Sequence, residues 1–327
     1  MLFRLATFCF CTLLYVSGAS AFELQGHRGA RGLMPENTLP AFAKALSIGV
    51  STLELDLSVT ADNRVVVSHN PALDPDLTRG ADGAWIAEQL LINSLNYEAL
   101  QTFDVGRIRP GSRAASRFPE QQAVDGTSLP SLEQVFDLVE RSGNTSVRFN
   151  IETKINPLEP QDTVDAETFA TLVLAIVKAR GFENRVSIQS FDWRTLQAVQ
   201  AKAPDLETVY LTAQQDWLNN VQSTAGTASK WTAGFNLDDY SGNLPQMVKA
   251  TGGDVWSPFF GDVSPALVKQ AQALGLKVIP WTVNDTAMME TLIDTGVDGL
   301  ITDFPDRLRA VMKGRGMALP PATPVEP

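Results

Sequence analysis

Cysteine is almost absent from this chain of 327 residues. Its two cysteines, Cys9 and Cys11, both lie near the N-terminus. Once that segment is removed, no thiol is left for nucleophilic catalysis, for zinc ligation or for a disulfide bond. We therefore expect one large hydrophobic core to stabilise the fold without covalent cross-links.

Long apolar runs are also missing. The run Leu5–Val16 follows Arg4 and is shorter than the roughly 20 residues that a membrane-spanning helix needs. This run and the small residues Ala19-Ser20-Ala21 after it are typical of a secretory signal peptide with its cleavage site. We predict a signal peptide over residues 1–21, cleaved after Ala21, and a periplasmic or secreted protein without stable membrane insertion. A retained N-terminal anchor is the alternative.

Positive charge is in deficit, since the formal net charge is −11. An acidic surface repels nucleic acid and anionic lipid, so neither is an expected partner. It also repels an anionic small molecule unless the binding site itself is locally positive.

A glycine-rich dinucleotide loop is absent as well, while short strand-like runs alternate with helical stretches. The predicted strands are Glu23–Gly26, Thr52–Leu57, Val147–Glu152, Val186–Gln189, Thr208–Leu211, Asp254–Ser257, Lys277–Trp281 and Gly299–Ile301. The predicted helices are Leu39–Ile48, Ser131–Arg141, Ala166–Arg180, Trp193–Ala201, Pro265–Leu274 and Thr286–Thr295. This alternation is typical of an α/β protein with a TIM (β/α)8 barrel. An open doubly wound sheet is the alternative, but it often carries the missing loop.

The barrel is predicted to span residues 22–313, with a loop-rich insertion over 72–128 after the second strand and its hairpin. Turn-forming residues are frequent in the insertion, which we interpret as a lid over the barrel. Residues 214–247 are a second candidate for irregular structure. The proline-rich tail, residues 314–327, is predicted to be disordered.

Histidine is scarce, yet both histidines occupy informative places. His27 follows the first predicted strand, and His69 follows Val65-Val66-Val67-Ser68. Catalytic groups of TIM barrels gather at the carboxyl ends of the strands. Both residues are therefore candidates for acid–base chemistry, whereas an arbitrary histidine is more often structural.

Carboxylates also gather at strand ends. Alternate residues of a strand share a face, so Glu54 and Asp56 point together while the intervening leucines point away. Asp62-Asn63 is a favourable two-residue hairpin loop, and centring the turn there places Asp56 opposite His69, about 5 Å away. Glu152 shares a strand face with Asn150 and Lys154.

Three carboxylates, which are hard oxygen ligands, and the lack of a cysteine favour Mg²⁺ or Ca²⁺ over zinc. A solvated strand edge or an exposed ion pair is the simpler interpretation of either motif alone. Together with one divalent cation, Arg28 and Lys154, the three carboxylates leave a net charge of one positive unit. That charge suits a phosphodiester, which carries one negative charge.

These residues resemble the glycerophosphodiester phosphodiesterase family. The resemblance rests on motifs in the family's order across the chain: His27-Arg28-Gly29, Pro35-Glu36-Asn37-Thr38, Glu54-Leu55-Asp56, Ser68-His69, Glu152-Thr153-Lys154, Gln189-Ser190-Phe191, Trp281-Thr282-Val283-Asn284, Asp298-Gly299 and Thr302-Asp303. It implies a TIM barrel with an insertion after the second histidine, in the place of residues 72–128. One departure is Asn70, where the family commonly has aspartate.

The resemblance also implies roles for individual residues. Glu54, Asp56 and Glu152 would bind one divalent cation, and His27 and His69 would form the general acid–base pair. Arg28 and Lys154 would hold phosphate oxygens, Glu36 and Asn37 would support the first loop, and Phe191 and Trp281 would line the glycerol side. The reaction implied is hydrolysis of a glycerophosphodiester to glycerol 3-phosphate and an alcohol. The residues leave open which histidine is the acid and which is the base.

Two other functions are compatible with the same residues. A phospholipase C- or D-like barrel would act on lipids at a membrane, and Trp85, Ile86, Leu90, Leu91 and Ile92 of the insertion could contact lipid. A non-catalytic protein that binds phosphodiesters would need no acid–base pair. The acidic chain and the retention of both histidines favour an enzyme acting on small soluble diesters.

Overall fold

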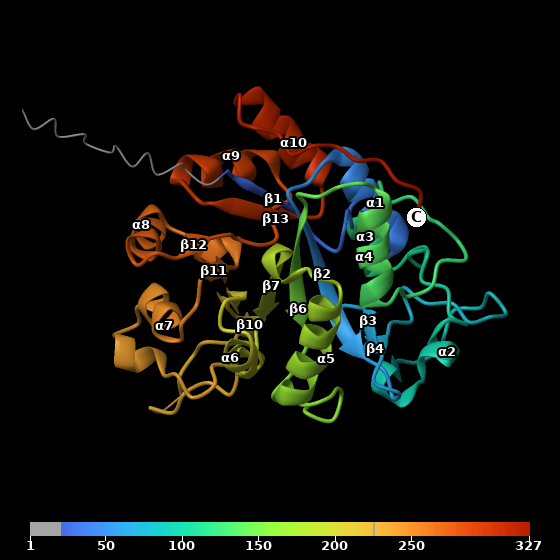
Figure 1. Ribbon diagram of the computed structural model, residues 1–327, viewed down its shortest axis with the longest axis horizontal. Coiled ribbons are helices and arrows are strands. Elements are labelled where there is room, and N and C mark those ends of the chain that lie inside the picture. The colour runs from blue at the N-terminus through green and yellow to red at the C-terminus, as the bar shows by residue number, and fades with distance from the viewer. Residues whose placement is uncertain (1–20, 225) are drawn as a thin grey trace, which may run out of the picture.

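The computed structural model describes residues 21–224 and 226–327, so the predicted signal peptide lies outside the described residues except for Ala21. Strands and helices alternate along the chain (Figure 1). The barrel strands are β1 (Glu23–Gly26), β2 (Thr52–Val59), β6 (Arg148–Thr153), β7 (Val186–Ser190), β8 (Glu207–Thr212), β11 (Val255–Pro258), β12 (Lys277–Val278) and β13 (Gly299–Thr302). The helices that follow them are α1 (Leu39–Ile48), α4 (Leu132–Arg141), α5 (Ala166–Ala179), α6 (Trp193–Lys202), α7 (Leu244–Ala250), α8 (Pro265–Ala273), α9 (Thr286–Thr295) and α10 (Pro305–Gly314).

These strands form a nearly closed ring. They pair in parallel in the order β12-β11-β8-β7-β6-β2-β1-β13. At the seam, Asp298 N–H donates to the Val278 carbonyl at 2.9 Å and Ile301 N–H donates to the Pro280 carbonyl at 3.0 Å. The predicted TIM barrel is confirmed and the open sheet was the wrong alternative. β12 is shorter than predicted, since Pro280 has no N–H to donate to a ladder.

Local sequence signals position the helices. Asp192 and Ser264 accept backbone N–H groups at the N-termini of α6 and α8, as caps of these types do. Gly49 and Gly296 end α1 and α9 with φ of 88° each, a left-handed conformation that glycine adopts without a Cβ clash.

Strand β2 shows the predicted alternation. Leu53, Leu55 and Leu57 are fully buried in the main core between the sheet and the helices. Glu54 and Asp56 are equally buried but belong to the opposite face, inside the ring. Because both faces of the strand are buried, the two carboxylates lose most of their hydration. They therefore need hydrogen-bond or charge partners inside the barrel.

The hairpin after β2 differs from the prediction. β3 (Val65–Val67) pairs with β2 through Leu57–Val67 and Val59–Val65, so Asp56 faces Ser68 and not His69. The loop is one residue longer than predicted, because Thr60 N–H closes it by donating to the Arg64 carbonyl at 3.0 Å.

Asn63 alone in this loop has a left-handed φ, of 60°. A type I turn followed by one such residue gives a three-residue loop. The pairing of the two strands is therefore shifted by one residue from the predicted register. His69 still lines the central cavity, because it lies beyond the end of the ladder at Val67.

The insertion is loop-rich and packs around its own small core. Its elements are β4 (Ala72–Leu73), β5 (Leu90–Leu91), a 3₁₀ turn (Ile92–Ser94), α2 (Tyr97–Leu100) and α3 (Arg113–Arg117). Leu73, Ile92 and Leu100 are buried together with Val66 and Leu129. The segment lies at one side of the barrel, around α2 and β4 in Figure 1.

Short elements also punctuate the second stretch predicted to be irregular. They are β9 (Gln214–Gln215), β10 (Leu218–Asn219) and a 3₁₀ turn (Leu237–Tyr240), and two further 3₁₀ turns occur elsewhere (Glu183–Arg185 and Phe260–Asp262).

The C-terminal tail is held against the barrel, which contradicts its predicted disorder. Thr323 N–H donates to the Leu46 carbonyl at 2.9 Å, and Asn144 Nδ2 donates to Thr323 Oγ1 at 3.1 Å. Leu319 and Val325 pack on the main core. Figure 1 shows the C-terminus beside α1 and α4. Proline content predicted disorder, but apolar residues between the prolines find surface to cover.

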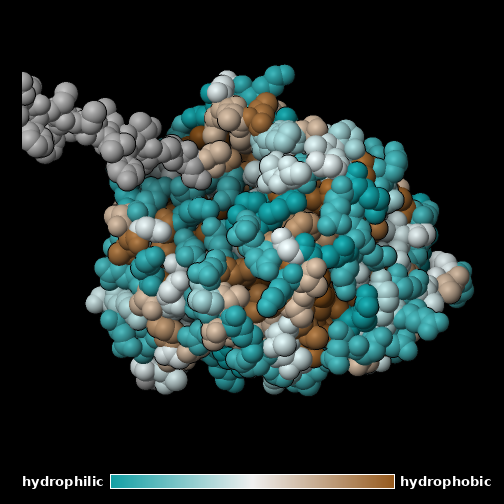
Figure 2. Space-filling view, viewed as in Figure 1, coloured by the Kyte–Doolittle hydropathy of each residue, from teal (hydrophilic) through white to brown (hydrophobic). Residues whose placement is uncertain are grey.

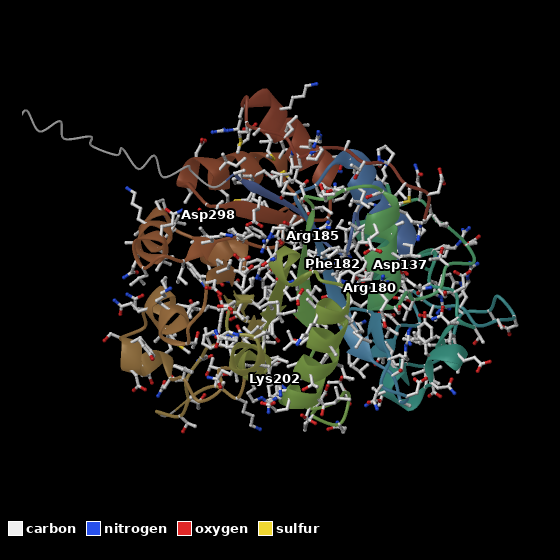
Figure 3. The ribbon with its side chains drawn as sticks, in the orientation of Figure 1. Asp137, Arg180, Phe182, Arg185, Lys202 and Asp298 are labelled. Atoms are coloured by element: carbon white, nitrogen blue, oxygen red, sulfur yellow. The ribbon has the colours of Figure 1, made fainter. Side chains whose placement is uncertain are left out.

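A cluster of phenylalanine rings joins α4 to the sheet. The Phe136 ring centroid lies 4.8 Å from those of both Phe149 and Phe182, and the Arg185 guanidinium lies 4.8 Å from the Phe182 centroid. Figure 3 labels Phe182 and Arg185 in this region.

Replacing Phe136 with alanine is expected to lower the free energy of unfolding by about 3–5 kcal/mol, since it removes a buried ring and leaves a cavity. Urea denaturation measures this loss. Leu158→Ala is the matched control because that side chain is 59% exposed, and surface truncation changes stability by about 0.5 kcal/mol or less. Equal losses in the two variants would contradict the packing described.

Hydrophilic residues cover most of the face shown in Figure 2, with hydrophobic side chains visible between them. Within the described part of the chain, no helix combines the length and apolarity needed to cross a membrane.

Candidate active site

Three buried carboxylates meet inside the barrel. β2 supplies Glu54 and Asp56, and β6 supplies Glu152, which is the direct partner of Asp56 in the parallel register. One oxygen of each residue lies within 4.8 Å of the others. The structure thus brings together the three residues for which metal ligation was predicted.

Two of the three carboxylates are oriented by donors from neighbouring elements. Glu54 accepts from Gln189 Nε2 of β7 at 2.7 Å and from the Arg28 backbone N–H at 2.8 Å. Asp56 Oδ2 accepts from Asn37 Nδ2 at 2.9 Å. Asp56 Oδ1 is buried without a hydrogen-bond partner in the described residues. A buried carboxylate oxygen that accepts no hydrogen bond, in a cluster of three carboxylates, is an arrangement that a cation completes.

Burial and mutual repulsion shift the pKa values of the three carboxyl groups. Burial raises the pKa of Glu54 well above its usual range, and Asp56 and Glu152 raise it further. Burial likewise raises the pKa of Glu152 to about 7, with Lys154 opposing this rise. Burial also disfavours ionisation of Asp56, but Arg28 and other positive groups outweigh it and hold the pKa below the usual value. A divalent cation would relieve the repulsion among the three groups.

Two cations face the triad. Arg28 Nε lies 3.2 Å from Asp56 Oδ2 and its Nη1 lies 2.7 Å from Glu36 Oε1. Lys154 Nζ lies 2.9 Å from Glu152 Oε1. Both side chains line the same cavity as the carboxylates, so they offset two of the three negative charges, and a bound divalent cation would make the site locally positive in an acidic protein.

The loop after β1 is shaped by tight backbone geometry. Arg28 and Gly29 adopt positive φ of 51° and 84°. A Cβ at Gly29 would lie 2.7 Å from the Ala41 backbone of α1, so only glycine lets the loop pass this close. Glu36 binds Arg28 here, and Asn37 binds Asp56, which places both predicted supporting residues under the first loop.

His27 is fixed by a carboxylate that sequence reasoning did not assign. Its Nδ1 lies 2.6 Å from Asp303 Oδ1, at the end of β13, and its Nε2 lies 4.0 Å from Glu54 Oε2. Asn284 Nδ2 donates to the other Asp303 oxygen at 2.7 Å. Burial lowers the pKa of His27 although Asp303 raises it.

Among the described residues, no carboxylate bonds directly to the ring of His69. Its Nδ1 lies 2.7 Å from Asn70 Oδ1. Burial, then Arg28 and Lys154, hold its pKa well below the usual value of 6.5. Burial therefore disfavours protonation of both imidazoles.

The side chains surround one cavity of about 470 Å³. One part of its wall is polar and includes Asp74 and Arg113 from the insertion, and another part is aromatic. There Phe191 and Trp281 pack edge to face, with centroids 5.2 Å apart. Trp217 stands at the rim and is 61% exposed. The insertion forms a wall of the site, whereas the prediction had it as a lid.

Four residues that orient the site were not assigned roles from sequence: Gln189, Asn284, Asp303 and Arg31, which lies 2.7 Å from Glu36 Oε2. Gln189 and Asp303 sit in motifs that had been noticed, at the ends of β7 and β13. Their positions at the ends of predicted strands were the one sequence feature that could have indicated a role in the site. Their partners could not be named, because those contacts join residues more than a hundred positions apart.

Comparison with known proteins agrees with this geometry. Residues 27–307 match the glycerophosphoryl diester phosphodiesterase family. A glycerophosphodiester phosphodiesterase from Caldanaerobacter subterraneus subsp. tengcongensis is 29% identical over 289 residues, which cover 88% of this chain and 97% of that protein.

Solved structures show the same likeness. A Silicibacter pomeroyi protein assigned to the glycerophosphoryl diester phosphodiesterases is 35% identical with a TM-score of 0.81, covering 91% of this chain and 95% of that one. An Oleispira antarctica phosphodiesterase, solved with its product sn-glycerol-3-phosphate, shares the fold at 19% identity and a TM-score of 0.64, covering 88% and 96%. Because the family match spans most of the chain and includes both histidines and all three carboxylates, this protein belongs to the glycerophosphoryl diester phosphodiesterase family.

Proposed function

We propose that this protein hydrolyses soluble glycerophosphodiesters to glycerol 3-phosphate and an alcohol, using one divalent cation, Ca²⁺ or Mg²⁺, and two histidines. The observation that carries the proposal is the meeting of a buried carboxylate triad, two imidazoles and two cationic side chains in one cavity. Acid–base groups beside an anion-binding site are the set of parts that phosphodiester hydrolysis requires.

The donor set fits a hard cation. Glu54, Asp56 and Glu152 would hold it, since they offer only oxygen ligands and Asp56 Oδ1 accepts no hydrogen bond in the described residues. When bound, the cation supplies positive charge to the phosphoryl oxygens. It also removes the repulsion that raises the pKa of Glu54.

Arg28 and Lys154 hold the phosphate on either side of the triad. Arg28 is anchored by Glu36 and Asp56, and Lys154 by Glu152, so both charges are fixed before the substrate arrives. Fixed charges stabilise the charge that shifts onto the phosphoryl oxygens in the transition state without having to reorganise. The local positive charge also overcomes repulsion from the acidic surface.

The two histidines transfer the protons. One removes a proton from water or from the glycerol 2-hydroxyl, and the other protonates the departing alcohol. They must therefore start in opposite protonation states, although burial disfavours protonation of both. Burial, then Arg28 and Lys154, disfavour a protonated His69, while Asp303 stabilises a protonated His27. These environments favour His27 as the acid and His69 as the base.

The aromatic wall receives the glycerol part of the substrate. Phe191 and Trp281 present carbon surface beside Lys154, whose Nζ lies 5.8 Å from the Phe191 ring centroid. The carbon atoms of glycerol can pack on such rings while the phosphate stays with the cations.

The N-terminal segment directs the protein to the periplasm or the exterior. N-terminal sequencing of the exported protein should begin at Phe22.

The decisive experiment measures glycerol 3-phosphate released from glycerophosphocholine, with EDTA and with added Ca²⁺ or Mg²⁺. We expect turnover that EDTA abolishes and that either metal restores. Phosphatidylcholine liposomes in parallel test the lipid-directed alternative, and tight diester binding without turnover would favour a binding protein. No turnover of glycerophosphocholine by folded, metal-loaded protein would overturn the proposal.

A further inference from the structure

His69 is held by an amide, which fixes the position of its ring proton. The side-chain oxygen of Asn70 lies 2.7 Å from His69 Nδ1, and an amide oxygen can only accept a hydrogen bond. Neutral His69 therefore carries its proton on Nδ1 and keeps the lone pair on Nε2.

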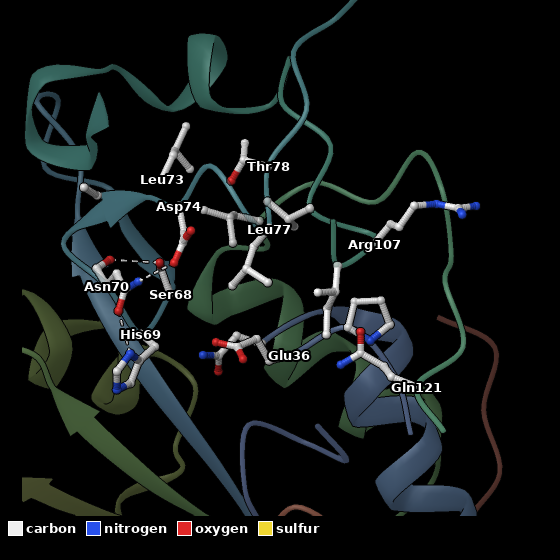
Figure 4. Close-up of a pocket in the computed structure, with 16 residues that line it drawn as sticks. Glu36, Ser68, His69, Asn70, Leu73, Asp74, Leu77, Thr78, Arg107 and Gln121 are labelled. Atoms are coloured by element: carbon white, nitrogen blue, oxygen red, sulfur yellow. Dashed lines mark hydrogen bonds between the residues drawn. The ribbon is translucent and has the colours of Figure 1, made fainter. Parts of the chain in front are cut away.

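The direction of the Asn70 amide is set in turn by Asp74. Asn70 Nδ2 donates to Asp74 Oδ2 at 3.4 Å, as the dashed lines of Figure 4 show. Turning the amide over would place its oxygen against the carboxylate and its NH₂ group against His69 Nδ1. The second arrangement brings acceptors together and requires the other tautomer of the histidine. The Asp74 carboxylate thus selects the tautomer of His69 without contacting its ring, by fixing the Asn70 amide that lies between them.

Further hydrogen bonds hold both Asp74 and Asn70 in place. Asp74 Oδ1 accepts the Asp76 backbone N–H at 2.8 Å, which fixes the carboxylate in the first turn of the insertion. The Asn70 carbonyl accepts from Ser68 Oγ at 3.0 Å and from Ser58 Oγ of β2 at 3.3 Å. One end of the relay is tied to the barrel and the other to the insertion, so its geometry does not depend on the substrate.

We propose that Asp74 is a positioning residue that, through the Asn70 amide, holds His69 in the Nδ1–H tautomer with Nε2 available to accept a proton. This inference rests on the proposed function, in which His69 transfers a proton. It also gives the insertion a part in the chemistry. The carboxylate expected at position 70 is replaced by an amide and a carboxylate four residues later.

Nitrogen-15 NMR of the histidine rings tests the tautomer without turnover. The chain has only two histidines, so His27→Gln assigns the His69 signals. At alkaline pH the wild type should show the Nδ1–H tautomer for His69. Asp74→Asn should give a mixture, because an amide at position 74 can present either its oxygen or its NH₂ group. An Nε2–H tautomer in the wild type, or no change in Asp74→Asn, would overturn the proposal even if the protein proved inactive on diesters.

Kinetics supply the second test. Asp74→Asn should lower kcat about 10–100-fold with little change in KM, the range found for residues that orient a functional histidine. Asp82→Asn is the matched control, since the Asp82 carboxylate also accepts a backbone N–H in a turn of the insertion, from Ala84 at 3.0 Å, and is exposed. That control should keep wild-type kcat.

Rescue separates positioning from folding. Asn70→Asp places a carboxylate directly on His69 and makes the relay unnecessary. In that background Asp74→Asn should cause no loss, because it removes a carboxylate that would now repel its neighbour. An equal loss of kcat in both backgrounds would show that Asp74 only stabilises the fold, and would contradict the proposal.

Discussion

His27→Gln and His69→Gln are each expected to lower kcat on glycerophosphocholine by about 10²–10⁴-fold, the usual contribution of a general acid or base. The two variants should differ when the leaving group changes. A glycerophosphodiester of p-nitrophenol leaves without protonation, so loss of the acid costs little. His27→Gln should recover most of its activity on this substrate, because Asp303 favours the protonated ring. His69→Gln should stay slow on both substrates.

Metal binding provides the control for these variants. Neither histidine belongs to the carboxylate triad, so added Ca²⁺ or Mg²⁺ should raise the Tm of both variants as it does in the wild type. Loss of that rise would mean that the substitution damaged the site as a whole. Recovery by His69→Gln in place of His27→Gln would reverse the assignment of acid and base.

Glu54→Gln should abolish turnover and yet stabilise the metal-free protein. The carboxylate is buried beside Asp56 and Glu152, and this environment raises its pKa. The neutral amide removes one buried charge while it keeps the shape and can still accept from Arg28 N–H. In the wild type, cation at about 100 times its Kd should add about 2.7 kcal/mol of stability, whereas Glu54→Gln should gain much less.

Burial of Glu152 near Asp56 also gives the metal-free protein an unusual pH dependence. Glu152 has a folded pKa of about 7 against an ordinary value of 4.5. The native state therefore binds more protons than the unfolded state between these values, so its stability falls as pH rises through that interval. The loss from this group is on the order of 2–3 kcal/mol, and bound cation should oppose it.

Calorimetry from pH 4.5 to 7 with and without EDTA measures this slope. Glu152→Gln should flatten the metal-free profile. Glu88→Gln, an exposed carboxylate of the insertion, should leave it unchanged. The same slope in metal-free wild type and metal-free Glu152→Gln would contradict the arrangement of the triad.

Local sequence patterns predicted much of this protein. The two-residue period of β2 placed Glu54 and Asp56 on one face, and caps such as Asp192 and Gly296 bounded the helices. Eight strand-like runs alternating with helices were enough to predict a barrel. In a barrel, the carboxyl ends of all strands lie at one face, so the side chains at these ends were expected to lie close together. These inferences succeed because they depend on residues a few positions apart, whose geometry the backbone dictates.

Long-range contacts decided the rest. The length of the hairpin loop turned on Asn63 adopting a left-handed φ, and the tail was ordered by contacts with α1 that no local pattern encodes. The partners of the two histidines, Asp303 for His27 and Asn70 with Asp74 for His69, were likewise not predicted. The residue types and periodicity of the sequence determined which groups carry the chemistry. Only the tertiary structure decided how their protons and charges are held, because hydrogen bonds and buried charges depend on distances across the closed barrel.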